Sequence, residues 1–181
     1  MKKLLDQIVD DIKVEFMDKF DKNFQDKAFF GKPWKVTRLS NARGSLMMRT
    51  GRLRKSIRPS RSGKNIRFYS DAPYSAIHNE GGEIVVTSKM KAYFWYMHLK
   101  LSDKSSQVKT KQYQKRYNLE AEQWKALALK KVGSKINIDQ RQFLGWDDSL
   151  LEDVQRIALA NLQEHMVELA RQIEEKATRR V

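Results

Sequence analysis

The stretch Asp71-Ala-Pro-Tyr-Ser-Ala-Ile-His-Asn-Glu-Gly-Gly82 decides how this 181-residue chain folds, because it separates two segments with strand character. It contains Pro73 and the pair Gly81-Gly82, residue types that interrupt regular structure and mark turns. A strand of the type Glu-Ile-Val-Val-Thr starts directly after Gly82, so we expect the glycine pair to take positive φ values there. The sequence therefore predicts an architectural turn over residues 71–82.

Strand patterns lie on both sides of this turn. Residues 56–61 and 64–70 predict a β-hairpin around Ser62-Gly63, and Pro59 marks the first strand as an edge strand because proline cannot donate to a ladder. A third strand is expected over residues 83–87 and a fourth over 135–138, and these two are predicted to pair as a hairpin. Together they indicate a small antiparallel sheet.

Helical patterns flank and interrupt the strands. Apolar residues at spacings of three and four predict a helix over about residues 3–20 and a long last helix over about 149–176, with most of one apolar stripe from Leu151 to Ile173. Residues 89–133 lie inside the second hairpin and predict an inserted helical arm, with helices over 89–101 and 119–132 and a flexible lysine-rich segment over 102–112. The expected fold class is α+β, with residues 1–181 forming a single domain.

Composition restricts the functional classes. The chain has no cysteine, which excludes disulfides and thiolate metal sites, and it has no apolar run of the roughly 18 residues that a membrane span needs. Its N-terminus picks up acidic residues at once, unlike a signal peptide, so we expect no membrane partner. The net charge of +14 and the pI near 9.9 predict a polyanionic neighbour, either nucleic acid or an acidic protein surface.

Catalytic patterns are weak. Asp71, Ser75 and His78 are close in sequence, but no Gly-x-Ser-x-Gly elbow surrounds the serine. The three histidines are isolated from one another, the glycine pair is not followed by the Lys-Ser or Lys-Thr of a phosphate loop, and the carboxylates are scattered. We therefore predict a protein that is not an enzyme and that uses no cofactor and no metal.

Three motifs in a fixed order resemble the tailed-phage virion morphogenesis family, the tail-completion or neck proteins such as that of phage Mu. The motifs read Leu-Met-x-Arg-Thr-Gly-x-Leu-x-x-Ser-Ile, then Tyr-x-x-Ile-His-x-x-Gly-Gly, then Arg-x-Phe-Leu-Gly before the long last helix. The matching residues are Leu46, Met47, Thr50, Gly51, Leu53, Ser56 and Ile57; Tyr74, Ile77, His78, Gly81 and Gly82; and Arg141, Phe143, Leu144 and Gly145. Two features depart from the family: the segment 89–133 is long, and Gln140 stands where proline is often expected.

The resemblance implies a non-enzymatic virion protein at the head-tail junction, or neck, that completes or joins the tail. Its expected partners are copies of itself in a ring and the tail terminator, head-completion or portal-side proteins, with the inserted arm or the N-terminal helix reaching the neighbouring copy. Non-specific contact with phage DNA is a further expectation. The residues expected to contact DNA or an acidic partner are Arg49, Arg52, Arg54, Lys55, Arg58 and Arg61.

Two alternatives stay open at this point. One is a basic nucleic-acid-binding protein of a mobile element, with the same six residues on phosphates, although the sequence carries no helix-turn-helix, zinc-finger or RNA-binding signature. The other is a hydrolase built around His78.

Overall fold

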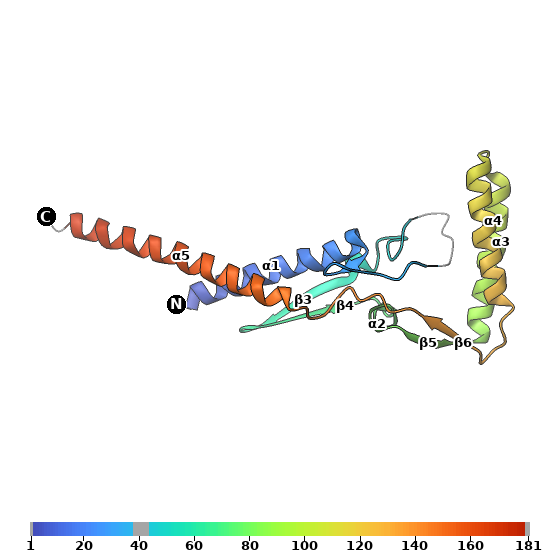
Figure 1. The fold of residues 1–181 in the computed structure, drawn as a ribbon, viewed down its shortest axis with the longest axis horizontal. Coiled ribbons are helices and arrows are strands. Elements are labelled where there is room, and N and C mark those ends of the chain that lie inside the picture. Colours follow the sequence, from blue (N-terminus) through green and yellow to red (C-terminus); the bar gives the residue numbers. More distant parts are fainter. Residues whose placement is uncertain (1, 38–43, 180–181) are drawn as a thin grey trace.

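The computed structural model describes residues 2–37 and 44–179 and shows an elongated α+β protein (Figure 1). Its helices are α1 (Lys2–Asp26), α2 (Ser75–Glu80), α3 (Ser88–Gln107), α4 (Lys111–Ala128) and α5 (Ser149–Thr178), with a short 3-10 turn at Arg54–Ser56. Its strands are β1 (Ala28–Phe29), β2 (Lys32–Pro33), β3 (Ile57–Ser62), β4 (Asn65–Ser70), β5 (Gly82–Val85) and β6 (Lys135–Ile138). The predicted α+β class, the helices at both ends of the chain and the helical hairpin between them are confirmed.

The strands form separate two-stranded antiparallel ladders. β3 pairs with β4 from Ile57–Ser70 to Ser62–Asn65, and β5 pairs with β6 from Gly82–Ile138 to Val85–Lys135, as the sequence predicts. The expectation of one sheet is wrong, because no ladder joins these hairpins in the described part of the chain. The short β1–β2 hairpin was not predicted, and it turns through Phe30 and Gly31, both with positive φ.

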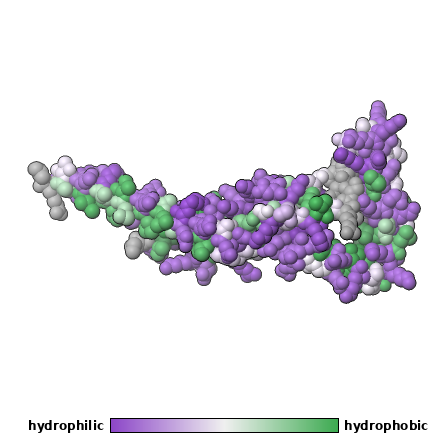
Figure 2. All heavy atoms as spheres, in the orientation of Figure 1, coloured by the Kyte–Doolittle hydropathy of each residue, from purple (hydrophilic) through white to green (hydrophobic). Residues whose placement is uncertain are grey.

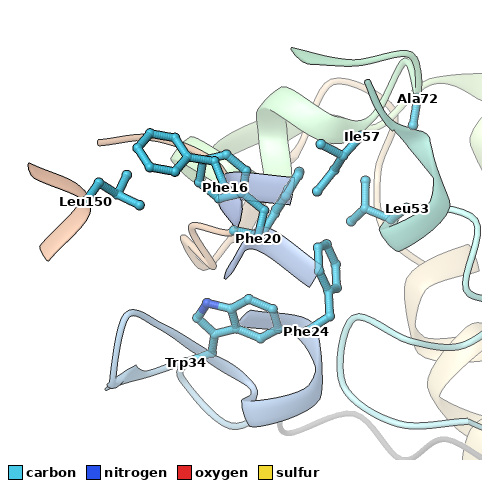
Figure 3. Packing of buried hydrophobic residues seen from close by; sticks show 9 residues of the cluster. Phe16, Phe20, Phe24, Trp34, Leu53, Ile57, Ala72 and Leu150 are labelled. Atoms are coloured by element: carbon cyan, nitrogen blue, oxygen red, sulfur yellow. The ribbon is translucent and has the colours of Figure 1, made fainter. Parts of the chain in front are cut away.

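An aromatic core holds the body together (Figure 3). Phe16, Phe20 and Phe24 recur every four residues, so they share one face of α1, and this face is buried. Phe24 is fully buried, with its ring centroid 5.1 Å from that of Phe143 and 5.6 Å from that of Trp34. The first helix therefore runs to Asp26, beyond its predicted end, because Phe24 continues the buried face.

The helix α5 lies against α1 and then extends past it (Figure 1). Leu150 and Ile157 are buried, and Asn161 donates its side-chain N–H to Asp11 at 2.9 Å. An ion pair of 3.0 Å between Lys19 and Asp153 adds a second polar contact between the two helices. After Asn161, α5 contributes no buried residue in the described chain, so its second half projects from the body.

Helices α3 and α4 form an antiparallel arm that stands across the long axis of the body (Figure 1). Leu101, Tyr117 and Ala121 form its small core. The flexible segment predicted over 102–112 is wrong: α3 continues to Gln107 and α4 starts at Lys111. The Ser105 hydroxyl donates to the Gln114 carbonyl at 3.1 Å and ties the two helices together next to this turn.

Candidate assembly site

The stretch 71–82 contains the short helix α2, so the prediction that it is only a turn is wrong. Pro73 precedes α2 and Gly81 ends it, and proline before a helix and glycine after it are favourable end residues. Gly81 and Gly82 have φ values of 75° and 135°, which confirms the predicted positive φ. A Cβ at Gly81 would lie 2.9 Å from the Gln140 nitrogen, so glycine lets α2 approach the segment that carries the third motif.

The second and third motifs meet in one hydrogen-bonded junction. The Arg141 N–H donates to the His78 carbonyl at 2.8 Å. The Asn79 side-chain oxygen accepts from the N–H groups of Phe143 and Leu144, at 2.9 and 3.0 Å. The sequence analysis missed Asn79, because a single asparagine inside a short helix carries no periodic signal. This junction joins the body to the β5–β6 ladder that carries the arm.

The first motif reaches the same core from another side. Leu53 and Ile57 are buried in one cluster with Phe143. The Ser56 hydroxyl donates to the Leu53 carbonyl and lies 2.6 Å from the Ser70 hydroxyl, which ties the turn to β4. Thr50 accepts a long bond of 3.4 Å from the Arg52 N–H, and Gly51 has a φ of 72°. The predicted motif residues of this group therefore shape a turn and the core behind it.

The remaining motif residues surround the junction. The Tyr74 ring lies edge-on to the imidazole of His78, with centroids 6.0 Å apart. A Cβ at Gly82 would meet the end of the Ile77 side chain at 3.1 Å. Gly145 has a φ of 150°, and a Cβ there would lie 2.5 Å from the Gln142 Nε2 and 3.8 Å from the Phe29 ring.

A buried arginine and a half-buried histidine set the electrostatics of the junction. Arg141 is 8% exposed, and its guanidinium donates to the Lys35 carbonyl at 3.1 Å and lies 3.6 Å from the Asp139 carboxylate. Burial lowers the pKa of His78, and the charge of Arg141 lowers it further. The buried Nδ1 of His78 has no hydrogen-bond partner among the described residues.

The catalytic reading of the stretch finds no support in this geometry. Asp71 forms an ion pair of 3.3 Å with Arg58, and the Ser75 N–H donates to the Ala72 carbonyl. Within residues 2–37 and 44–179, no hydrogen bond joins Asp71, Ser75 and His78, and no three His, Asp or Glu side chains gather as metal ligands. No helix in these ranges is long and apolar enough to cross a membrane.

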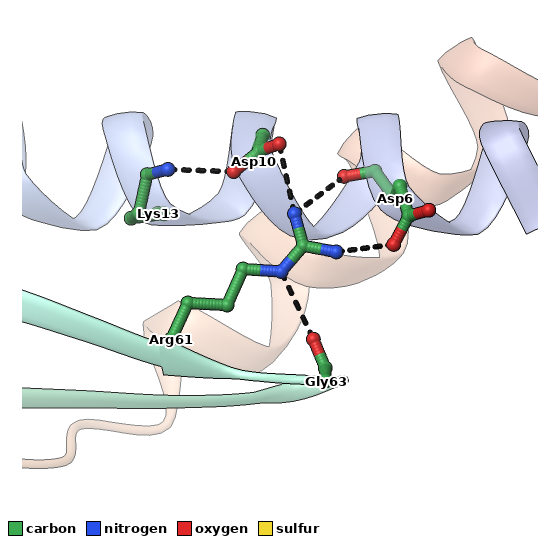
Figure 4. Close-up of polar contacts among 5 residues, drawn as sticks. All are labelled: Asp6, Asp10, Lys13, Arg61 and Gly63. Atoms are coloured by element: carbon green, nitrogen blue, oxygen red, sulfur yellow. Dashed lines mark hydrogen bonds and ion pairs between the residues drawn. The ribbon is translucent and has the colours of Figure 1, made fainter.

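Four of the six predicted basic contact residues already pair with carboxylates of the chain. Arg49 pairs with Glu120 on the arm, and Arg54 pairs with Asp21 on α1. Arg58 pairs with Asp71, as described above. Arg61 binds Asp6 and Asp10 and donates to the Gly63 carbonyl at 2.9 Å, which fixes the tip of the β3–β4 hairpin to α1 (Figure 4).

These pairs change the role of the basic cluster. Lys13 and then Arg61 lower the pKa of Asp10, and Arg54 lowers that of Asp21. In the described chain, Arg52 and Lys55 take part in no ion pair. The prediction that this cluster contacts DNA or an acidic partner stays a prediction. Most of its cations already form ion pairs with carboxylates of the same chain.

The projecting half of α5 carries an exposed apolar seam. Leu159, Met166 and Ile173 recur every seven residues. Leu162 and Leu169 form a second row with the same seven-residue spacing, offset from the first row by three residues. We call these five residues the α5 seam; their exposed fractions lie between 43% and 68%. Figure 2 shows hydrophobic residues along one edge of this projecting helix. The single stripe predicted for this helix is thus two faces, one packed on α1 and one open.

The residues that flank the seam include no lysine, arginine, aspartate or glutamate. They are Ala158, Gln163, His165, Ala170, Gln172 and Ala177. Charged residues at such flanking positions usually set the choice of partner helix, and like charges there repel. Because these flanks are uncharged, no like-charge repulsion opposes the pairing of the seam with the same seam of a second copy.

Comparisons of the chain with protein families, with curated proteins and with solved structures find no match.

Proposed function

We propose that the protein is a non-enzymatic structural subunit of a tailed-phage virion, which acts at the head-tail junction and completes or joins the tail. In this proposal it forms a ring with copies of itself and contacts the tail terminator, head-completion or portal-side proteins. The order of the three motifs supports the assignment to this class of protein. The open α5 seam is the observation that supports self-assembly most directly.

The motif junction supports a scaffolding role. Residues from three distant segments converge on one junction built from backbone hydrogen bonds and aromatic packing, with Asn79 and Phe143 at its centre. A subunit that transmits contacts between neighbours needs its projecting parts held at a fixed angle. The junction provides this, because it joins the body that carries α5 to the ladder that carries the arm.

The α5 seam supports a second copy of the chain as its occupant. A helix that exposes five apolar residues in a seven-residue repeat buries them best against a helix with the same spacing. A neighbouring α5 has that spacing and the same uncharged flanks. One face of α1 already packs on α5 of its own chain, so we favour α5 over the N-terminal helix as the element that reaches the neighbouring copy.

Immunogold electron microscopy of phage particles, with an antibody against this protein, tests the proposed location. We expect gold label at the junction between head and tail of intact particles. Label found only on free protein, or on the head shell or tail fibres, would contradict the location. A variant that lacks residues 91–131 provides a second readout, because loss of joined particles is expected if the arm takes part in the neck.

A further inference from the structure

The arm carries more than half of the net charge of the chain. Residues 89–133 contain eleven lysines and arginines against three acidic residues, a net charge of +8 out of the +14 of the whole protein. One of the three acidic residues, Glu120, is 2% exposed and pairs with Arg49 of the body. The surface of the arm is therefore strongly cationic.

The cations of the arm are also more available than those of the body. Among the described residues, a single ion pair lies within the arm, between Lys125 and Glu122 at 3.8 Å on an exposed surface. In the 49–61 cluster, by contrast, Arg49, Arg54, Arg58 and Arg61 all pair with carboxylates. A polyanion that meets this protein would therefore find cations without a carboxylate partner more densely spaced on the arm than on the body.

Two tyrosine rings lie between lysines along one face of α3. Lys89, Tyr93, Tyr96, Lys100 and Lys104 follow one another at spacings of four, three, four and four, so they form one stripe, which we call the α3 stripe. Tyr93 and Tyr96 are 53% and 54% exposed, and their centroids lie 6.4 Å apart. The Lys100 ammonium lies 5.4 Å from the centre of the Tyr96 ring.

The arm holds this stripe on a rigid support. The Tyr93 ring packs edge-on to Trp124 of α4 with centroids 5.9 Å apart, and Trp124 in turn packs on the buried Phe94 at 5.7 Å. Figure 2 shows hydrophobic residues on the part of the arm next to β5 and β6, while the far end at the α3–α4 turn is hydrophilic. Exposed rings on a supported helix offer flat faces to a ligand at little loss of side-chain freedom.

We propose that the α3 stripe is a binding site for nucleic acid, read without sequence preference and with single strands bound more tightly than duplex. Lysines attract the phosphate backbone of either form and release its counterions. Tyrosine faces stack on bases, but only unpaired bases offer their faces. This inference does not rest on the proposed place of the protein in a virion.

Fluorescence anisotropy with labelled oligonucleotides tests the proposal on the full-length protein. The probes are a single strand of about 30 nucleotides, a duplex of the same length and polyglutamate as an unlabelled competitor, over about 50 to 200 mM salt. We expect tighter binding of the single strand than of the duplex, a steep fall in affinity with salt, and weak competition by polyglutamate.

Two variants separate charge from stacking. Lys89→Gln/Lys100→Gln/Lys104→Gln should weaken the binding of both probes. The slope of log affinity against log salt for the single strand should be smaller by about 2, because about 0.7 counterion is released per phosphate contact. Tyr93→Leu/Tyr96→Leu keeps apolar volume and helix propensity. It should lower the affinity for the single strand by about fivefold per ring and leave the affinity for the duplex unchanged. Circular dichroism melts check that both variants fold.

A control on the body that removes the same number of charges is Lys22→Gln/Arg52→Gln/Lys55→Gln, at three exposed positions. It should bind the single strand nearly as the wild type does. Absence of binding at low salt, an equal loss in this control, equal effects of the tyrosine variant on both probes, or full competition by polyglutamate would each overturn the proposal.

Discussion

At the scale of single residues, polar side chains that no hydrophobic periodicity points to help to hold the segments of the body together. Asn79 shows this best, because one side-chain oxygen accepts both the Phe143 and the Leu144 N–H groups. Leaving a buried N–H without an acceptor costs roughly 1–3 kcal/mol. The sequence predicts that His78 and Phe143 matter, but only the fold shows that Asn79 lies between their segments.

Asn79→Ala is expected to destabilise the protein. Both N–H groups lose their acceptor, so we expect the free energy of unfolding to fall by about 1–3 kcal/mol, measured by urea denaturation. Asn79→Asp keeps the accepting oxygen and is the matched control, with a smaller loss expected. Equal stability of Asn79→Ala and the wild type would show that water replaces the lost contact.

His78 is expected to make stability depend on pH. Its folded pKa lies below the ordinary value near 6.5, because it is partly buried and faces the charge of Arg141. Between the two pKa values the unfolded chain binds more protons, so stability is present above about pH 6.5 and is lost as the pH falls below it. The carboxylates with lowered pKa values, such as Asp10 and Asp21, lose their contribution at lower pH still.

Urea denaturation at about pH 8 and about pH 5.5 measures this effect. His78→Gln should show a smaller loss of stability between the two pH values than the wild type. His165→Gln, on α5 and away from Arg141, is the matched control and should lose as much as the wild type. An unchanged pH dependence in His78→Gln would rule out His78 as its source.

At the scale of elements, periodic segments could be predicted and interrupted ones could not. The paired strands around Ser62-Gly63 and the long first and last helices follow from their apolar repeats. Pro73 and Gly81 suggest a turn when taken as isolated breakers, but together they bracket a helix of six residues. Residues 102–107 look flexible because they are polar, yet packing of α3 on α4 keeps them helical.

Phe143 lies in the core cluster that contains residues of α1, β3 and α5, so removing its ring should lower the stability of the whole body. Its side chain is 1% exposed and packs on Phe24. Phe143→Ala leaves a cavity and is expected to cost about 3–5 kcal/mol, with a lower melting temperature in calorimetry. Phe143→Leu fills most of the space and should cost less. A melting temperature near that of the wild type in Phe143→Ala would contradict the central place of this ring.

At the scale of the whole molecule, the chain has one packed body and two projections. The motif residues lie in the body, where they hold the projections in place, and the exposed apolar and cationic surfaces lie on α5 and on the arm. A sequence pattern can show that a helix is apolar on one side. It cannot show whether that side is covered within the chain, and this decides whether a partner is needed.

Sedimentation velocity measures most directly whether the α5 seam joins copies of the chain. We expect the wild type to sediment as an assembly larger than the 21.3 kDa monomer, and Leu162→Glu/Leu169→Glu to sediment as a monomer. Val14→Glu/Val36→Glu, which places the same charges at exposed apolar positions of the body, should stay assembled. A wild type that is monomeric at every concentration, or a seam variant that assembles like the wild type, would contradict the account.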